Sequence, residues 1–398
     1  MCRLTRVSRS RILSSLAVVW LAVSTAAVAA HAAPGDLACN QDPGSRFYWL
    51  ERAFCDLEMA GPERAQGLII WNHGIQGTTE SWKAPAPPVL RLVQARGWDV
   101  IMLKRHHLAE TMPGGPLDRT VKRTLEEAAA QKKAGYKKIA LAGQSFGGYV
   151  TMEAIDTSPD LDAAIAFAPG IRPHGGSGAL DPAIVERILE RARVGRLAVV
   201  FPKDDALFGN IARGERARPI LAKRAFPWLM VDEEAGEITG HGGATTGRFA
   251  LRYGRCLSAF LSAAAPAAGR FECQPTGDDW RVVRELLLPR DSRPPASAVN
   301  PEILPADLRT LLGLWWAMVG DTLALIEPVD DGGKLKLMYR TGPGGGIYDA
   351  TITDGVIRAV LRNKATVQVS PQENGTVTWI SADKSRTLKG TLRRVEDP

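Results

Sequence analysis

One stretch near the middle of the chain, residues 138–149, constrains the fold more than any other. Its sequence, KIALAGQSFGGY, begins as a short apolar run typical of a buried strand and continues as Gly-x-Ser-x-Gly around Ser145, and a segment compatible with a helix follows it. Gly143 and Gly147 suit a turn so tight that a side chain at either position would strike a neighbouring element. The stretch therefore predicts a strand, a sharp turn and a helix, with Ser145 exposed at the apex as a candidate nucleophile.

The stretch resembles the nucleophile elbow of α/β hydrolases, and the resemblance covers residues from about 60 to 265. It implies an α/β fold with a doubly wound, mostly parallel sheet. Apolar runs that alternate with segments of helical period support the same reading, because strands separated by helices favour a parallel sheet covered on both faces. One or two short antiparallel strands are expected within 47–57, before the main sheet. The expected strands of the main sheet are 67–74, 98–103, the run that leads into Ser145, 163–168, 197–201 and 227–231, and the expected helices are 88–96, 117–134, 149–157, 182–193 and 248–264.

The first 32 residues have the pattern of a secretory signal peptide. Four arginines precede an uncharged apolar run over 12–30, and Ala30-His31-Ala32 provides the small residues that a signal peptidase accepts. A membrane anchor is the alternative, because the run is about long enough to span a bilayer. A lipoprotein is disfavoured, since an acid stands near Cys39 where a lipobox has an aliphatic residue. The prediction is a secreted or periplasmic protein without stable membrane insertion once the signal is removed.

The cysteine count fits an exported protein. Cys2 leaves with the signal, and Cys39, Cys55, Cys256 and Cys273 remain, an even number. Three pairings are possible, and closeness along the sequence favours Cys39 with Cys55 and Cys256 with Cys273. Free buried thiols are the alternative.

The net charge excludes an electrostatic argument for nucleic acid or membrane binding. The whole chain carries +7, but its first 32 residues hold four arginines and no acid, so 46 basic residues face 43 acidic ones in the remainder, a balance of +3. The expected partner is a small-molecule or polymer ester substrate. The oligomeric state stays open.

Composition and apolar periodicity divide the chain into four predicted parts: the signal peptide 1–32, an α/β-hydrolase catalytic domain 33–274, a linker 275–305 with six prolines, and an all-β domain 306–398. In the last part apolar residues alternate at period two in about seven short runs. Turn sequences such as Gly344-Gly345-Gly346 and Asp354-Gly355 lie between them. We expect an antiparallel barrel or sandwich. The Gly-x-Trp near its start resembles the opening of lipocalin-type barrels.

The resemblance to α/β hydrolases implies a triad in the order serine, acid, histidine. The strand expected at 197–201 ends at Asp204 and Asp205, and His241 is the only histidine that follows them. We assign Ser145 as nucleophile, His241 as base and Asp205 as the acid that orients it. Asp204 stays open as an alternative, because the choice rests on the usual length of the loop.

The oxyanion site is expected from two backbone amides. His73-Gly74 after an early strand resembles the family's oxyanion segment, in which the histidine side chain shapes the loop. The amide of Ile75 in that loop and the amide of Phe146 after the serine are the predicted donors to the oxyanion.

No metal or organic cofactor is expected. His106 and His107 are adjacent on a strand, so their side chains point to opposite faces, and no cysteine or carboxylate pattern completes a tetrahedral site. The glycines after 143 lack the lysine of a phosphate-binding loop. Arg105, His106, Lys203 and Trp82 are possible neighbours of the substrate.

Together these features predict an exported serine hydrolase that cleaves carboxylic esters through an acyl-enzyme. Fewer than thirty residues separate the strands ending at 168 and starting at 197, which leaves no room for a cap domain. An open site of this kind resembles the dienelactone hydrolase-like and carbohydrate esterase branches. A serine peptidase on the same fold, and a binding protein without turnover that uses the β-domain, are the alternatives.

Overall fold

The computed structural model describes most of the α/β region and the strands of the C-terminal region. The described residues are 37–39, 41–42, 44–55, 57–75, 82, 84–106, 116–158, 161–171, 182–275, 313–317, 322–328, 335–341, 344–360, 364–371, 377–382 and 387–394. The predicted signal peptide, the linker after its first residue and His107 lie outside these residues, so the structure does not test them.

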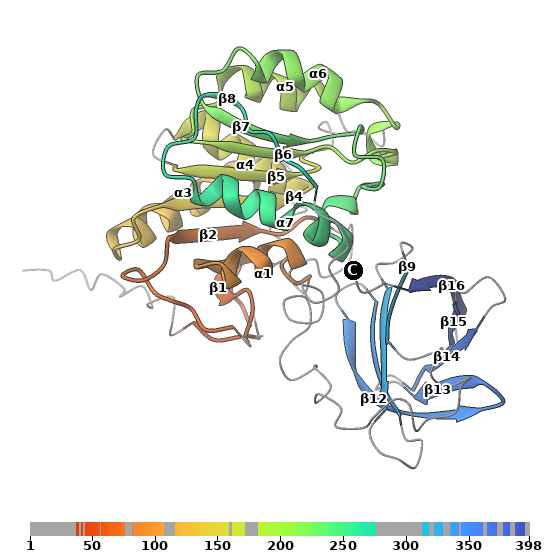
Figure 1. The fold of residues 1–398 in the computed structure, drawn as a ribbon. Coiled ribbons are helices and arrows are strands. Elements are labelled where there is room, and N and C mark those ends of the chain that lie inside the picture. The colour runs from red at the N-terminus through yellow and green to blue at the C-terminus, as the bar shows by residue number, and fades with distance from the viewer. Residues whose placement is uncertain are drawn as a thin grey trace, which may run out of the picture. The chain divides into compact units, whose positions relative to one another are not determined.

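Eight strands form one mixed sheet in the order β1-β3-β2-β4-β5-β6-β7-β8 (Figure 1). Only the β1–β3 pair is antiparallel, and the other neighbours are parallel. The strands are β1 (Tyr48–Arg52), β2 (Gly67–Asn72), β3 (Trp98–Arg105), β4 (Ile139–Gln144), β5 (Ala163–Phe167), β6 (Leu197–Val200), β7 (Pro227–Val231) and β8 (Gly269–Arg270).

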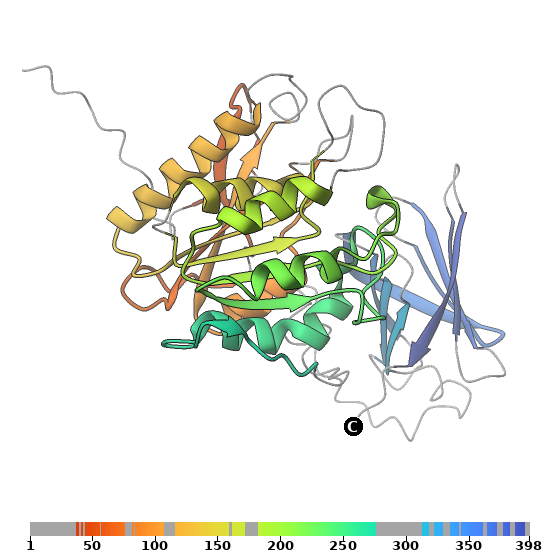
Figure 2. The same ribbon diagram turned by 90° about the horizontal axis from the view of Figure 1, so that it is seen from above.

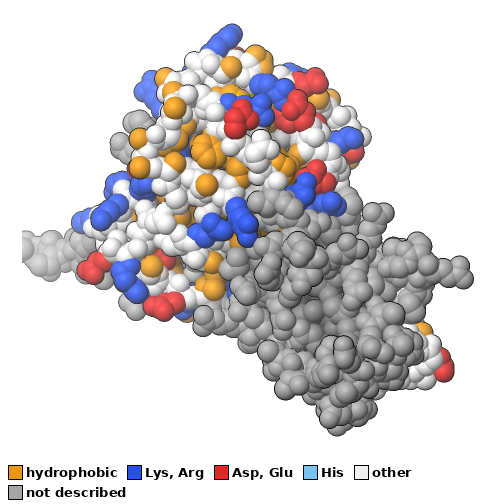
Figure 3. Space-filling view, viewed as in Figure 1, with side chains coloured by type: hydrophobic (Ala, Val, Ile, Leu, Met, Phe, Trp, Pro, Cys, Tyr) orange, Lys and Arg blue, Asp and Glu red, His pale blue; other side chains and the backbone are white. Residues whose placement is uncertain are grey.

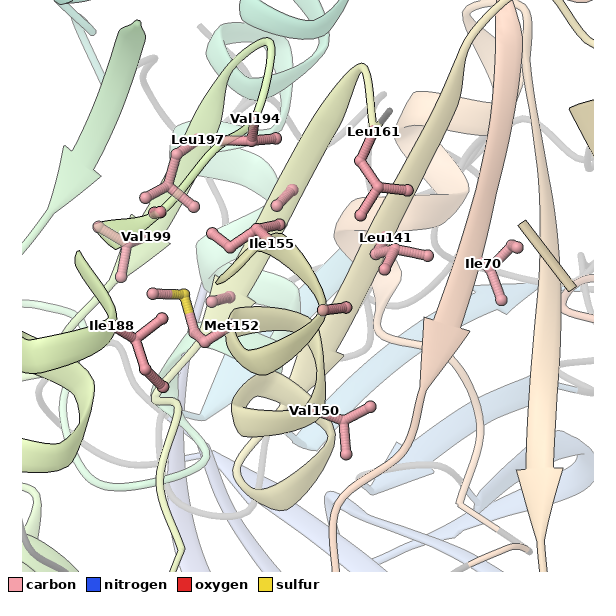
Figure 4. Packing of buried hydrophobic residues seen from close by; sticks show 14 of the residues in the cluster. Ile70, Leu141, Val150, Met152, Ile155, Leu161, Ile188, Val194, Leu197 and Val199 are labelled. Carbon is pink, nitrogen blue, oxygen red and sulfur yellow. The ribbon is translucent and has the colours of Figure 1, made fainter. Parts of the chain in front are cut away.

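Helices cover both faces of this sheet, which explains why its central strands read as continuous apolar runs. The helices are α1 (Pro88–Ala95), α3 (Pro116–Lys133), α4 (Phe146–Thr157), α5 (Pro182–Arg191), α6 (Arg213–Leu221) and α7 (Gly247–Ser262). One core lies under α1 and α7, and a second lies under α3, α4, α5 and α6 (Figure 2). Figure 4 shows the second core, where Val150 and Met152 of α4 pack with Leu141 of β4 and Ile188 of α5.

The fold class predicted for this region is confirmed, with two elements missed. Helix α6 was not expected, because Pro219 and a run of charged residues conceal its apolar positions Ala217 and Leu221. Strand β8 has two residues and was not expected either. Both elements belong to the half of the sheet that follows β6.

Two disulfides join the cysteines as the sequence predicted. Cys39 pairs with Cys55 on the two sides of β1, and Cys256 of α7 pairs with Cys273 beyond β8. Each bridge closes a short loop at one end of the α/β region.

The C-terminal strands form an antiparallel ring in which each pairs with the next in sequence, and β16 pairs with β9 to close a barrel. The strands are β9 (Gly313–Ala317), β10 (Thr322–Pro328), β11 (Leu335–Thr341), β12 (Gly344–Thr353), β13 (Val356–Val360), β14 (Thr366–Pro371), β15 (Val377–Ala382) and β16 (Thr387–Arg394).

Two of the predicted barrel turns have different outcomes. At Asp354-Gly355 both residues have positive φ, 53° and 71°, and the flanking Thr353 and Val356 pair, so this hairpin is confirmed. Gly344-Gly345-Gly346 was predicted as a turn, which is wrong. These glycines lie in β12, and Gly344 pairs with Thr341, so the chain reverses before the triplet.

On the face of the α/β region seen in Figure 3, positive and negative side chains are interspersed with apolar ones. Within the described part of the chain, no helix is long and apolar enough to cross a membrane.

Candidate active site

Ser145 stands at the sharp turn between β4 and α4. Its φ is 55° and its ψ is −120°, a conformation that non-glycine residues rarely adopt. A Cβ on Gly143 would lie 2.1 Å from the carbonyl oxygen of Gly147, and a Cβ on Gly147 would lie 2.0 Å from that of Asn72. The turn is therefore as tight as the sequence predicted, and both glycines are required by close backbone approach.

The loop after β2 lies against this turn. A Cβ on Gly74 would be 3.3 Å from Cβ of Ser145, so the segment that carries Ile75 passes directly beside the serine. Phe146 is the first residue of α4, where backbone amides are not used by the helix itself. The two predicted oxyanion donors thus come from segments that flank Ser145.

His73 fixes the conformation of the oxyanion loop from inside the protein. Its Nδ1 lies 2.9 Å from the carbonyl oxygen of Gly74, and its Nε2 accepts the backbone N–H of Arg105 at 3.0 Å. This pattern fits a neutral imidazole that carries its proton on Nδ1. Burial, with a smaller effect of Arg105, lowers the pKa of His73 well below its usual value and keeps the ring uncharged.

Arg105 at the end of β3 is fully buried beneath the same loop. Its guanidinium donates to Oδ1 of Asn72 at 3.2 Å and to the carbonyl oxygen of His73, and it lies 5.3 Å from the ring centroid of Phe146. Arg105 was considered a possible neighbour of the substrate. In the structure it supports the loop and the start of α4 instead.

His241 and Asp205 meet at the carboxyl edge of the sheet. Nδ1 of His241 lies 2.9 Å from Oδ2 of Asp205, whose other oxygen accepts the N–H of Leu207 at 3.1 Å. Asp205 is buried with 1% exposure. Asp204 is exposed, with a φ of 54°, and the hydrogen bond to His241 is made by its neighbour. The geometry therefore favours Asp205 of the two aspartates left open by the sequence.

The loop with His241 reaches the serine turn through Gln144. Nε2 of Gln144, the residue before Ser145, donates to the backbone carbonyl of His241 at 3.4 Å. Nε2 of His241 is buried and has no hydrogen-bond partner in the described part of the chain, so the bond to the hydroxyl of Ser145 is not formed in this structure. Such bonds are often long before substrate binds.

Sequence reasoning missed Arg213, at the start of α6. Its guanidinium lies 3.6 Å from the ring centroid of Phe208 and 4.5 Å from that of Phe201, and Nη2 donates to the carbonyl oxygen of Pro169 at 2.6 Å. Asp205, nearby, precedes the turn that carries Phe208. No local motif marks Arg213, because these contacts join the start of α6 to residues in the loops after β5 and β6.

Lys203, also named from the sequence, is exposed, and its backbone carbonyl accepts the N–H of Gly240, the residue before His241, at 2.7 Å. His106 donates its backbone N–H to the carbonyl oxygen of Phe47, and Trp82 packs edge-on against Trp49, so neither residue is recorded in contact with the triad. Among the residues that the structure describes, no group of three or more His, Cys, Asp or Glu side chains could hold a metal ion.

No protein-family model matches this chain, and neither does any curated protein. Solved structures show a distant likeness. A puromycin-hydrolyzing peptidase of Mycobacterium tuberculosis is 16% identical over 57% of this chain, with a TM-score of 0.39, and the match spans 38% of that protein.

A putative dienelactone hydrolase from Klebsiella pneumoniae is 12% identical over 54% of this chain and 98% of its own length, with a TM-score of 0.37. A truncated carbohydrate esterase from gut microbiota is 12% identical over 57% of this chain and 94% of its own, with a TM-score of 0.38. The α/β-hydrolase fold of this chain is identified by its own strand order and by the strand–serine–helix turn at β4.

Proposed function

Starting from the α/β-hydrolase fold of the region between β1 and β8, we propose that the chain is an exported serine hydrolase that cleaves carboxylic esters. The observation that carries the proposal is the 2.9 Å contact between His241 and the buried Asp205, in a loop that also touches the residue before Ser145. A buried carboxylate that holds an imidazole by Nδ1 leaves Nε2 as the proton acceptor, which is what a serine nucleophile needs.

In the proposed reaction the hydroxyl of Ser145 attacks the ester carbonyl carbon while Nε2 of His241 takes the hydroxyl proton. A tetrahedral intermediate forms, and its oxyanion receives hydrogen bonds from the amides of Ile75 and Phe146. The carbon–oxygen bond to the alcohol then breaks, and the imidazolium returns the proton to the leaving alkoxide. This leaves an acyl group on Ser145 and frees one alcohol.

Water completes the cycle. His241 takes a proton from a water molecule, whose oxygen attacks the acyl carbon and forms a second tetrahedral intermediate. The bond to the oxygen of Ser145 breaks, the serine recovers its proton from the imidazolium, and a carboxylic acid is released. Asp205 remains ionised throughout, because its role is to orient the imidazole and to stabilise its charge.

The surrounding architecture has a role in the same proposal. Residues 33–274 would be the catalytic unit, and 306–398 a β-domain joined to it by the Pro-rich segment 275–305. Export is supported by the two disulfides, which persist in oxidising compartments. We assign the β-domain no catalytic residue.

A hydrolysis screen tests the proposal directly. The mature chain and its Ser145→Ala variant are assayed on short p-nitrophenyl esters, acetylated sugars and aminoacyl p-nitroanilides. We expect the wild type to cleave esters, and the variant to lose this activity by about 10⁴-fold or more. Cleavage of the anilides alone would favour a serine peptidase. No turnover, combined with no labelling by a fluorophosphonate, would favour a binding protein.

A further inference from the structure

Arg213 is a buried cation that contacts the loop of Asp205 and the segment behind Ser145. It begins α6 and is 3% exposed. Burying a guanidinium is costly unless charges or hydrogen bonds compensate for the lost hydration. One guanidinium nitrogen, Nη1, is buried without a hydrogen-bond partner in the described part of the chain. The contacts and charges around the guanidinium must therefore compensate for its burial.

The first contact is with the loop behind the nucleophile. Nη2 of Arg213 donates to the carbonyl oxygen of Pro169 at 2.6 Å. The next residue, Gly170, donates its N–H to the carbonyl oxygen of Ser145 at 3.1 Å, and Ser145 donates its own N–H to Phe167 at 3.0 Å. Arg213 thus holds the segment 167–170, which in turn makes hydrogen bonds to the backbone of Ser145.

The second contact is with the turn of the proposed acid. Asp205 caps the one-turn helix Ala206–Phe208 through its side chain, and the N–H of Phe208 also bonds to the carbonyl oxygen of Asp205 at 3.0 Å. The guanidinium of Arg213 lies against the ring of Phe208. Because this turn is short, a displacement of Phe208 would displace the carboxylate of Asp205 as well.

The link to the base is indirect and runs through the same ring. The centroid of Phe208 lies 6.1 Å from that of the imidazole of His241. Glu233 holds the first turn of α6 in place. Its carboxylate accepts the backbone N–H groups of Arg213 at 2.5 Å and of Gly214 at 3.0 Å.

The charges around Arg213 come from three elements. Asp205 follows β6, Glu233 follows β7 and Glu186 lies on α5, and of these acids Asp205 acts most strongly on the guanidinium. Burial lowers the pKa of Arg213 to about 9, which leaves it charged at neutral pH. The cation therefore balances the buried carboxylate of the acid–base pair.

We propose that Arg213 is a positioning residue for the triad, which holds the turn of Asp205 and Phe208 and supplies the positive charge that balances the Asp205–His241 pair. The inference rests on the proposed serine hydrolase function. A cation repels an imidazolium, so removal of Arg213 is expected to change the pH dependence of the reaction.

The test is the pH dependence of Ser145 labelling by a fluorophosphonate, measured as a second-order rate constant between about pH 5 and 9. Arg213→Met and Arg213→Gln remove the charge, and Gln keeps a donor toward Pro169. Arg213→Lys keeps the charge without the planar group. Arg218→Met is the matched control, because it removes a cation of the same helix that pairs with Asp232 and Glu234 and not with the triad turn.

In Arg213→Met and Arg213→Gln we expect the acid limb of the profile to move to higher pH by roughly 0.5 to 1 unit, and the plateau to fall by about 10-fold. Arg213→Lys should lower the plateau and leave the acid limb close to that of the wild type. Arg218→Met should match the wild type in both respects.

An acid limb that stays in place in folded Arg213→Met and Arg213→Gln would overturn the inference and leave the proposed function intact. Failure of all three Arg213 variants to fold would assign the residue to stability alone and would overturn it too. A wild type that is not labelled at any pH would instead overturn the proposed function, and this inference with it.

Discussion

The two sides of the candidate site are built by different means. On the nucleophile side, Ser145 is fixed by backbone packed on backbone, where glycines at 143 and 147 let β4, α4 and the loop after β2 approach within atomic contact. On the acid–base side, His241 and Asp205 are held by side chains from loops after β6 and β7 and from the start of α6. The first arrangement is local in sequence, and the second is not.

This difference has a consequence for how each side responds to change. A tightly packed backbone cannot move to accommodate a larger side chain, so substitutions on the nucleophile side should reduce the free energy of unfolding. Side-chain contacts between loops can be lost one at a time, so substitutions on the acid–base side should reduce activity while the fold persists.

The largest effect is expected on the acid–base side, from Asp205→Asn. The amide cannot hold the imidazole in the required tautomer, so ester hydrolysis should fall by about 10³ to 10⁴-fold in a protein that still folds. Asp204→Asn is the matched control, because Asp204 is exposed and makes no contact with His241 that the structure records. Equal losses in kcat/KM for the two variants would remove Asp205 from the triad.

On the nucleophile side, Gly147→Ala should lower the unfolding free energy by about 3 kcal/mol, since its methyl group would lie 2.0 Å from a backbone oxygen. Gly236→Ala serves as control, because nothing lies within 4 Å of the added carbon. Urea denaturation of both variants measures the difference. A Gly147→Ala protein as stable as the control would show that the turn has room to move.

A third prediction concerns pH and the oxyanion loop. The pKa of His73 is lowered in the folded state, so below its ordinary value of 6.5 the unfolded chain binds a proton that the native protein does not. The stability contributed by the neutral ring is present above pH 6.5 and is lost as the pH falls, by up to about 1.4 kcal/mol per pH unit. Comparing the pH dependence of unfolding in wild type and His73→Gln tests this, and identical slopes would contradict it.

The smallest effect is expected where the two sides meet. Gln144→Leu removes the hydrogen bond from the serine turn to the carbonyl oxygen of His241. We expect kcat/KM to fall by roughly 5-fold, because one hydrogen bond that positions the loop of the base is lost. The unfolding free energy should change by less than about 0.5 kcal/mol. A loss confined to stability would place Gln144 with the backbone side of the site.

The same difference explains what the sequence could predict. The serine turn was predictable because its requirement for small residues is met within five positions, and the central strands because burial on both faces leaves a continuous apolar run. His241 could be chosen as the candidate base only because no other histidine follows the two aspartates, and a chain with more histidines would not have allowed that choice.

Other features could not be read from the sequence for physical reasons. Helix α6 carries a proline and four charged residues among nine, so its two buried apolar positions do not form a recognisable stripe. Arg213 contacts residues 169, 201 and 208, and none of these separations is encoded in a local pattern. The glycine triplet at 344 was misplaced because glycines favour turns, whereas here all three glycines pair with residues of β11.

We propose that His241, oriented by Asp205, makes the hydroxyl of Ser145 nucleophilic. The most direct test is to react the mature protein with a fluorophosphonate, identify the modified residue by mass spectrometry, and repeat the reaction with His241→Gln. We expect a single modified residue, Ser145, and a labelling rate reduced by about 10³-fold or more in the variant. Modification at another residue, or an unchanged rate in His241→Gln, would contradict it.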